Sequence, residues 1–79
     1  MRIDKYLKVA RVIKRRTIAS EACDKGRVRV NDKTVKPSYD IKVNDIVEVG
    51  FGDKQFRFKV LELKEFAKTE EIEKMIEIL

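Results

Sequence analysis

The densest chemistry in the sequence is a run of positive charge near its beginning. Residues 2–16 contain seven Lys or Arg side chains and a single acid, Asp4. Cationic side chains at this density bind phosphates, and Arg adds bidentate hydrogen bonding and stacking on exposed bases. We expect Arg2 and Arg16 to make the most important individual contacts. The run therefore indicates an anionic partner that presents phosphates.

The spacing of these cations predicts that a helix carries them. They recur every three or four residues, as Arg2, Lys5, Lys8, Arg11 and Arg15. An apolar stripe runs beside them, as Ile3, Leu7, Ala10 and Ile13. Such a helix anchors one side to a core and exposes the other. We expect it to run from Ile3 to Val12 or Ile13, with Asp4 in the first turn, where a negative charge suits the helix dipole.

A second short helix is expected directly after the first. Lys14-Arg15-Arg16 interrupts the apolar periodicity, which indicates a connection between the two helices. Thr17 is a plausible N-cap of the second helix. Small residues at helical spacing, among them Ala19 and Cys23, would let the two helices pack closely. Gly26 stands where a helix C-terminus favours a left-handed residue.

From Gly26 onwards the apolar period changes to two, which predicts strands. Turn residues separate the segments at Asn31-Asp32, Asn44-Asp45 and Gly52-Asp53. We expect a hairpin over 45–64, with a bulge or bend near Val60-Leu61, and a final helix over 69–79 capped by Thr69. The predicted fold class is α+β: two N-terminal helices on a small antiparallel or mixed sheet, with a short C-terminal helix, in one domain spanning 1–79.

The charge is distributed unevenly along the chain. Residues 1–36 hold twelve Lys and Arg against four Asp and Glu, a balance of +8, whereas residues 37–79 hold seven against ten, a balance of −3. A uniformly solubilising surface would not separate charge in this way. The asymmetry places the anionic partner on the N-terminal side.

Several classes of function are disfavoured by composition. The chain has no His and one cysteine, Cys23, so it offers no internal disulfide and no obvious metal site, and we expect no metal or cofactor. It has no glycine-rich phosphate loop or nucleophile motif, which argues against an enzyme. We see no signal peptide and no apolar run of membrane-spanning length. A cytoplasmic monomer is therefore expected.

A series of short motifs resembles a known RNA-binding domain. They are Arg2-x-Asp4-Lys5-x-Leu7, Arg15-Arg16-Thr17 with Ala19, Gly26-x-Val28-x-Val30-Asn31, Lys36-Pro37, and Asp45 before a strand. In this order, over residues 2–49, the sequence resembles the domain named after the fourth protein of the small ribosomal subunit. The resemblance implies two helices against a bent sheet, an α-L shape, with the helix pair placed on RNA. The family usually has Asn-Gly at Asn31-Asp32 and Gly-Asp at Asn44-Asp45, but Asn and Asp also tolerate the left-handed region.

The short chain is most similar to free-standing bacterial members of this family, the ribosome-associated quality-control factors and a small heat-shock ribosome-binding protein. The short acidic C-terminus favours the quality-control factors. The resemblance then implies binding to large-subunit ribosomal RNA and peptidyl-tRNA on stalled ribosomes. It also implies support of C-terminal tailing of nascent chains with a partner protein that recruits alanyl-tRNA. The alternatives are a module that tethers an rRNA-modifying enzyme in trans, or, in another class, a basic protein-interaction or membrane-surface module.

The candidate RNA-binding residues are Arg2, Asp4, Lys5, Lys8, Arg11, Lys14, Arg15, Arg16, Thr17, Lys25, Arg27, Arg29 and Lys36. For Asp4 two roles stay open, direct contact or orientation of a neighbouring Arg. Thr17 could be a helix cap, a ligand or both. Arg27, Arg29 and Lys36 could extend the basic patch or simply keep the surface soluble.

Overall fold

The first two helices are short, and both end in the same way. The computed structural model describes all residues 1–79, with α1 over Ile3–Val9 and α2 over Arg16–Asp24. At the end of α1, Arg11 donates its N–H to the Lys8 carbonyl and the next N–H, from Val12, reaches the Leu7 carbonyl. This is a Schellman motif, and Arg11 adopts the left-handed φ of 58° that it requires.

The prediction that the first helix continues to Val12 or Ile13 is therefore wrong. The sequence concealed the end because an arginine stands where glycine is usual. At the end of α2 the expected glycine is present: Gly26 has φ 73°, and the N–H of Arg27 reaches the Ala22 carbonyl. Ile13 lies beyond α1 but is still buried, as its place in the apolar stripe predicted.

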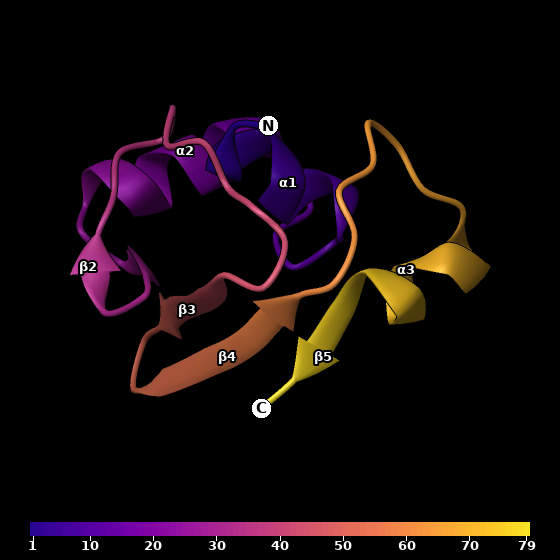
Figure 1. Cartoon of the computed structure of the whole chain (residues 1–79). Helices are drawn as coiled ribbons and strands as arrows, with labels where there is room; N and C mark the ends of the chain where they lie inside the picture. Colours follow the sequence, from indigo (N-terminus) through magenta and orange to yellow (C-terminus); the bar gives the residue numbers. More distant parts are fainter.

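Five antiparallel strands form one sheet in the order β2-β1-β3-β4-β5. Their bounds are β1 Val28–Val30, β2 Lys33–Thr34, β3 Ile46–Phe51, β4 Lys54–Val60 and β5 Ile76–Ile78. Figure 1 shows α1 and α2 together on one side of the sheet, with α3 (Thr69–Met75) beside the end formed by β4 and β5. The α+β class is confirmed, and the sheet is purely antiparallel.

The tight turns follow the predicted chemistry. Asn31 and Asp32 both have positive φ, 50° and 69°, which joins β1 to β2 through a two-residue turn. Asn44 has φ 78° and Gly52, between β3 and β4, has φ 58°. Asn and Asp thus support left-handed conformations at positions where the family usually has glycine.

The C-terminal segment differs from the prediction. The final helix ends at Met75, and residues 76–78 form β5 along β4 instead of a continued helix over 69–79. The N–H groups of Leu61 and Glu62 both donate to the Met75 carbonyl, and β4 has already ended at Val60. An extended Ile76 supplies the ladder partner that the edge of β4 would otherwise lack.

The first residue of α3 is Thr69, so Thr69 is not the N-cap that we predicted. The cap position belongs to Lys68, whose backbone N–H donates to the Glu71 carboxylate at 3.0 Å. The N–H of Glu71 returns a hydrogen bond to the Lys68 carbonyl. The first turn of α3 is thus closed by Glu71, three residues after the cap.

The core lies between the helix pair and the sheet. Its centre is Tyr6, which is fully buried, stacks on Phe58 with ring centroids 6.3 Å apart and donates its hydroxyl to the Met75 carbonyl at 3.0 Å. This single side chain connects α1, β4 and the junction of α3 with β5. None of the helices combines the length and apolar composition needed to cross a membrane.

Candidate nucleic-acid interface

A buried carboxylate joins the starts of the two helices. Asp4 is 2% exposed, and its carboxylate accepts hydrogen bonds from Arg2 Nε at 3.2 Å and Nη2 at 3.1 Å. Arg16 Nη2 lies 3.5 Å from the same carboxylate, and the N–H of Lys5 donates to it at 2.7 Å. Both arginine side chains are about half exposed, at 52% and 46%. We call Arg2 and Arg16 the N-terminal arginine pair.

The backbone fixes the arginine pair from the other side. Arg2 bridges to Asp40, and the N–H of Ile3 donates to the Tyr39 carbonyl at 2.8 Å. The terminal ammonium of Met1 lies 2.6 Å from the Asp40 carboxylate, which lowers the pKa of that carboxyl. Arg2 is therefore held on a short extended segment rather than on a fraying end.

Asp4 itself does not reach the surface. Its carboxylate is buried and contacts both guanidinium groups, which favours the orienting role of the two left open by the sequence; that role stays a prediction. The guanidinium groups retain outward N–H donors, because Asp4 engages only two nitrogens of Arg2 and one of Arg16. Fixed planar donors of this kind suit bidentate contact with phosphate.

Thr17 has no capping role. The N-cap residue of α2 is Arg15, without a side-chain cap, and the N–H of Ala19 donates to the Arg15 carbonyl. The helix thus begins two residues before the predicted start, which carries Arg16 in its first turn toward Asp4. The exposed Thr17 hydroxyl lies beside the arginine pair in sequence, and its role as a ligand stays a prediction.

Two of the predicted cations are bound to the C-terminal part of the chain. Lys5 forms an ion pair with Glu65 and is only partly exposed. Arg11 Nη1 donates to the Thr69 hydroxyl at 2.9 Å. The acidic half of the chain therefore reaches the basic face at Lys5.

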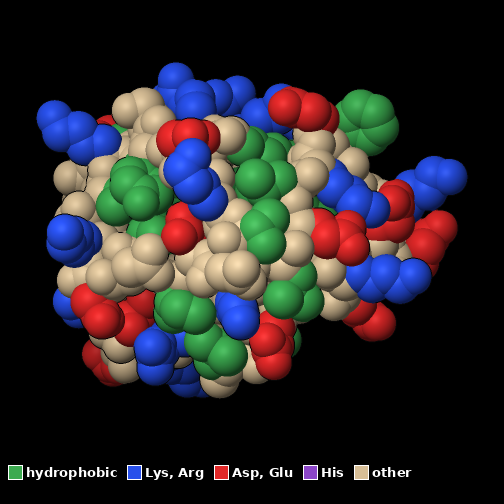
Figure 2. All heavy atoms as spheres, in the orientation of Figure 1, with side chains coloured by type: hydrophobic (Ala, Val, Ile, Leu, Met, Phe, Trp, Pro, Cys, Tyr) green, Lys and Arg blue, Asp and Glu red, His purple; other side chains and the backbone are tan.

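Three exposed cations keep their charges unpaired around the connection of the two helices. Lys8, Lys14 and Arg15 are exposed and have no carboxylate within 4.0 Å. Figure 2 shows Lys and Arg side chains along the upper and left edges of the molecule, where Figure 1 places α1 and α2. The right-hand part, over α3, mixes both signs of charge.

A second set of cations surrounds a hollow of about 270 Å³ between α2 and β3. Lys14, Lys25 and Arg27 line it together, and we call them the loop cation group. Glu21 is the one acid in that lining. Lys25 and Arg27 are exposed and form no ion pair. Their role as phosphate contacts stays a prediction.

Arg29 lies apart from the helices. It points off the sheet toward Glu48, at 3.8 Å, and donates to the Asp32 carbonyl at 2.8 Å. Arg57 on the next strand lies 3.4 Å from the same Glu48 carboxylate. The three side chains form a cross-strand charge ladder, which accounts for Arg29 without RNA.

The backbone that follows Lys36 contacts the start of α1. Its neighbour Pro37 accepts the N–H of Asp4 at 3.3 Å. Lys33, which the candidate set omits, lines a hollow of about 500 Å³ together with Lys36. Lys33 lies three residues before Lys36, but an isolated lysine beside a turn gives no periodic signal that would single it out.

Cys23 is a packing residue, as its small-residue neighbours predicted. It is 3% exposed within the core, and burial together with Asp4 and Asp24 raises the pKa of its thiol to about 11. No group of three or more potential metal ligands occurs in the structure.

Comparisons with known proteins identify the domain. Residues 1–47 match the S4 domain. The RQC P-site tRNA stabilizing factor of Streptococcus pneumoniae is 56% identical over 79 residues, which cover 100% of this chain and 90% of that protein. The factor of the same name from Bacillus subtilis is 48% identical, with 100% and 92% covered.

Solved structures share the fold over the whole chain. Heat Shock Protein 15 of Vibrio cholerae, described as trimeric, superimposes with a TM-score of 0.92 at 21% identity, covering 100% of this chain and 81% of the other. The hypothetical protein HP1423 gives 0.86 at 25% identity, with 100% and 96% covered. The resemblance found in the sequence is confirmed: this chain belongs to the S4 domain family and, within it, to the RQC P-site tRNA stabilizing factors.

Proposed function

We propose that this protein binds the large ribosomal subunit and the P-site tRNA of stalled ribosomes and holds that tRNA in place during ribosome-associated quality control. It acts by binding and not by catalysis. Its similarity to the RQC P-site tRNA stabilizing factors of S. pneumoniae and B. subtilis supports the proposal. While the tRNA is held, the nascent chain is extended at its C-terminus. A tailing factor is then a further partner of this protein, and the process takes place in the cytoplasm.

The observation that carries the proposal is the arginine pair on its buried carboxylate. Arg2 directly precedes α1 and Arg16 begins α2, yet Asp4 contacts both guanidinium groups at one place on the surface. A protein that must position one RNA against another needs fixed donors, because side chains that are ordered only on binding lose more conformational entropy. The unpaired Lys8, Lys14 and Arg15 add charge around this fixed point and strengthen contact with phosphates.

Removal of the arginine pair tests the proposal. The double variant Arg2→Ala with Arg16→Ala should lose most co-sedimentation with purified large subunits carrying peptidyl-tRNA. The matched control, Lys68→Ala with Lys74→Ala, removes two exposed positive charges near α3 and should sediment like the wild type. Circular dichroism and urea unfolding check that the variants are folded.

The double alanine variant leaves the buried Asp4 without a cationic partner and can destabilise the fold. The substitutions Arg2→Lys and Arg16→Lys keep a positive charge near Asp4 but remove the planar guanidinium fork. This variant should stay folded and still bind large subunits more weakly. Unchanged sedimentation of a folded alanine or lysine variant would contradict the assignment of the arginine pair.

A further inference from the structure

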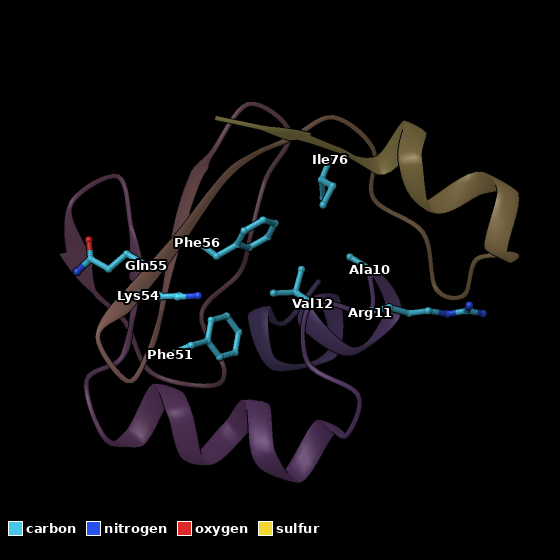
Figure 3. A pocket seen from close by; sticks show the side chains of 8 residues that line it. All are labelled: Ala10, Arg11, Val12, Phe51, Lys54, Gln55, Phe56 and Ile76. Carbon is cyan, nitrogen blue, oxygen red and sulfur yellow. The ribbon is translucent and has the colours of Figure 1, made fainter.

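A pocket opens beside the basic surface, between the α1–α2 connection, the β3–β4 hairpin and β5. Its volume is about 430 Å³, within the roughly 300–1,000 Å³ typical of small-ligand sites. Its walls include Val12, Phe51, Phe56 and Ile76, and we call it the hairpin pocket. Figure 3 shows the Phe51 and Phe56 rings and the Val12 and Ile76 side chains around one common space.

Two aromatic rings give the pocket a stacking surface. Phe51 is 45% exposed at the end of β3, and Phe56 is half-buried on β4, where it also contacts Phe58. Val12 and Ile76 supply aliphatic contacts on the other sides. A flat, largely apolar group can therefore lie against a ring that the fold otherwise leaves uncovered.

The charged residues of the pocket indicate which kind of flat group could bind there. Lys54 lies between the two rings in Figure 3, and no carboxylate lies within 4.0 Å of its ammonium group. Arg11 stands at the opposite edge and runs toward α3, where it contacts Thr69. Both charged residues of the lining are cations and neither Asp nor Glu contributes to it. A base with an attached phosphate satisfies both the rings and the ammonium group.

The pocket is also continuous with the proposed RNA surface. Val12 and Phe51 line both the hairpin pocket and the neighbouring hollow that holds the loop cation group. A strand of RNA whose phosphates contact Lys14 or Arg27 therefore passes the mouth of the pocket. This continuity favours a nucleotide over an apolar side chain from a protein as the occupant.

We propose that the hairpin pocket receives one unpaired nucleotide of the bound RNA, with its base stacked on Phe51 and its phosphate on Lys54. The inference rests on the proposed function and assigns it a second contact, away from the arginine pair. The protein then recognises an extruded base in addition to the shape of a phosphate backbone.

Two RNA hairpins with the same stem test the pocket. One carries a single bulged 2-aminopurine and the other is fully paired, and fluorescence anisotropy at one fixed salt concentration gives both dissociation constants. The wild type should bind the bulged hairpin about tenfold more tightly, because stacking of one base on an aromatic side chain has an effect of this order. The 2-aminopurine fluorescence should fall on binding as the base stacks.

Substitutions at Phe51 identify the ring responsible. Phe51→Leu keeps an apolar side chain and should remove the tenfold preference without weakening binding to the paired hairpin. Phe51→Tyr should keep the preference. Phe66→Leu is the matched control, since Phe66 is 85% exposed but lies outside the pocket lining, and it should bind like the wild type.

The two proposals fail in different ways. Equal affinity for the two hairpins, with unchanged 2-aminopurine fluorescence, would overturn the pocket alone and leave its apolar lining to a protein partner. A preference that survives in Phe51→Leu would overturn it as well. If the folded wild type binds neither hairpin, RNA binding by the basic surface is overturned, and the pocket inference is overturned with it.

Discussion

Asp4 is the residue on which the candidate site depends most, although it is an acid in a basic region. It is buried, and its carboxylate contacts the guanidinium group of Arg2, just before α1, and that of Arg16, at the start of α2. An ion pair of this kind is stabilising only while both charges remain, because an unpaired buried charge is strongly unfavourable. We therefore propose Asp4 as a positioning residue and the two arginines that it contacts as the residues that meet RNA.

Asp4→Asn should separate positioning from charge. The variant removes a negative charge, so its affinity for an arbitrary RNA duplex should be unchanged or higher. Its affinity for large subunits carrying peptidyl-tRNA should fall about tenfold, because Arg2 and Arg16 are no longer fixed in place. Filter binding to both RNAs measures the contrast. An equal loss of affinity for the duplex and for the large subunits would show that Asp4 supports only the fold. Urea unfolding would then show a loss of folding stability of about 1–3 kcal/mol.

Some residue roles could be predicted from the sequence and others could not. The apolar stripe identified Ile3, Leu7 and Ala10 as core residues because helical periodicity is local information. The orienting role of Asp4 stayed one of two alternatives, since Arg16 is twelve positions away and only the packing of two helices brings them together. Lys33 and Lys54 were missed because isolated lysines beside turns give no periodic signal.

At the scale of elements, both ends of the chain are held by contacts that sequence periodicity does not show. Tyr6 of α1 donates its hydroxyl to the Met75 carbonyl, and Arg11 contacts Thr69. The end of α1 was mispredicted because an arginine occupies the left-handed position. β5 was mispredicted because Ile72, Met75, Ile76 and Leu79 fit a helical period, while pairing with β4 is non-local.

The first turn of α3 should be sensitive to acid. The Lys64 ammonium, followed by the backbone N–H of Lys68, lowers the pKa of the Glu71 carboxyl below its ordinary value. A lowered pKa contributes stability that is present above the unfolded-state pKa, about 4.3, and is lost as the pH falls through the folded-state value. The protection factors of the amides at the start of α3, corrected for the intrinsic exchange rate at each pH, should therefore fall below about pH 4.

Glu71→Gln should remove this dependence and should already exchange faster at neutral pH. Glu73→Gln is the matched control, since Glu73 is exposed on the same helix and has no ion pair. It should leave the acid-induced loss of protection unchanged. Protection of α3 that is the same at pH 3 and pH 7 in the wild type would contradict the role of Glu71.

For the whole molecule, the separation of charge along the sequence is only partly a separation in space. The N-terminal half carries +8, yet Lys5 pairs with Glu65 from the acidic half and Arg29 pairs with Glu48. Composition predicted the sign of the partner's charge, and its indication that the N-terminal region meets the partner stays a prediction. It could not predict which cations are neutralised within the fold, because that depends on contacts as distant as 60 positions.

The unpaired cations should therefore determine how strongly binding depends on salt. Each phosphate contact that releases counterions steepens the fall of log K with log salt by about one. Lys8→Gln, Lys14→Gln and Arg15→Gln together should reduce the slope for large-subunit binding by about two to three. Lys59→Gln, Lys68→Gln and Lys74→Gln lower the net charge from +5 to +2 in the same way, and all three are likewise without ion pairs. If the local surface governs binding, only the first variant changes the slope. If the net charge governs binding, the two triple variants change the slope equally. That result would contradict a basic interface around the connection of the two helices.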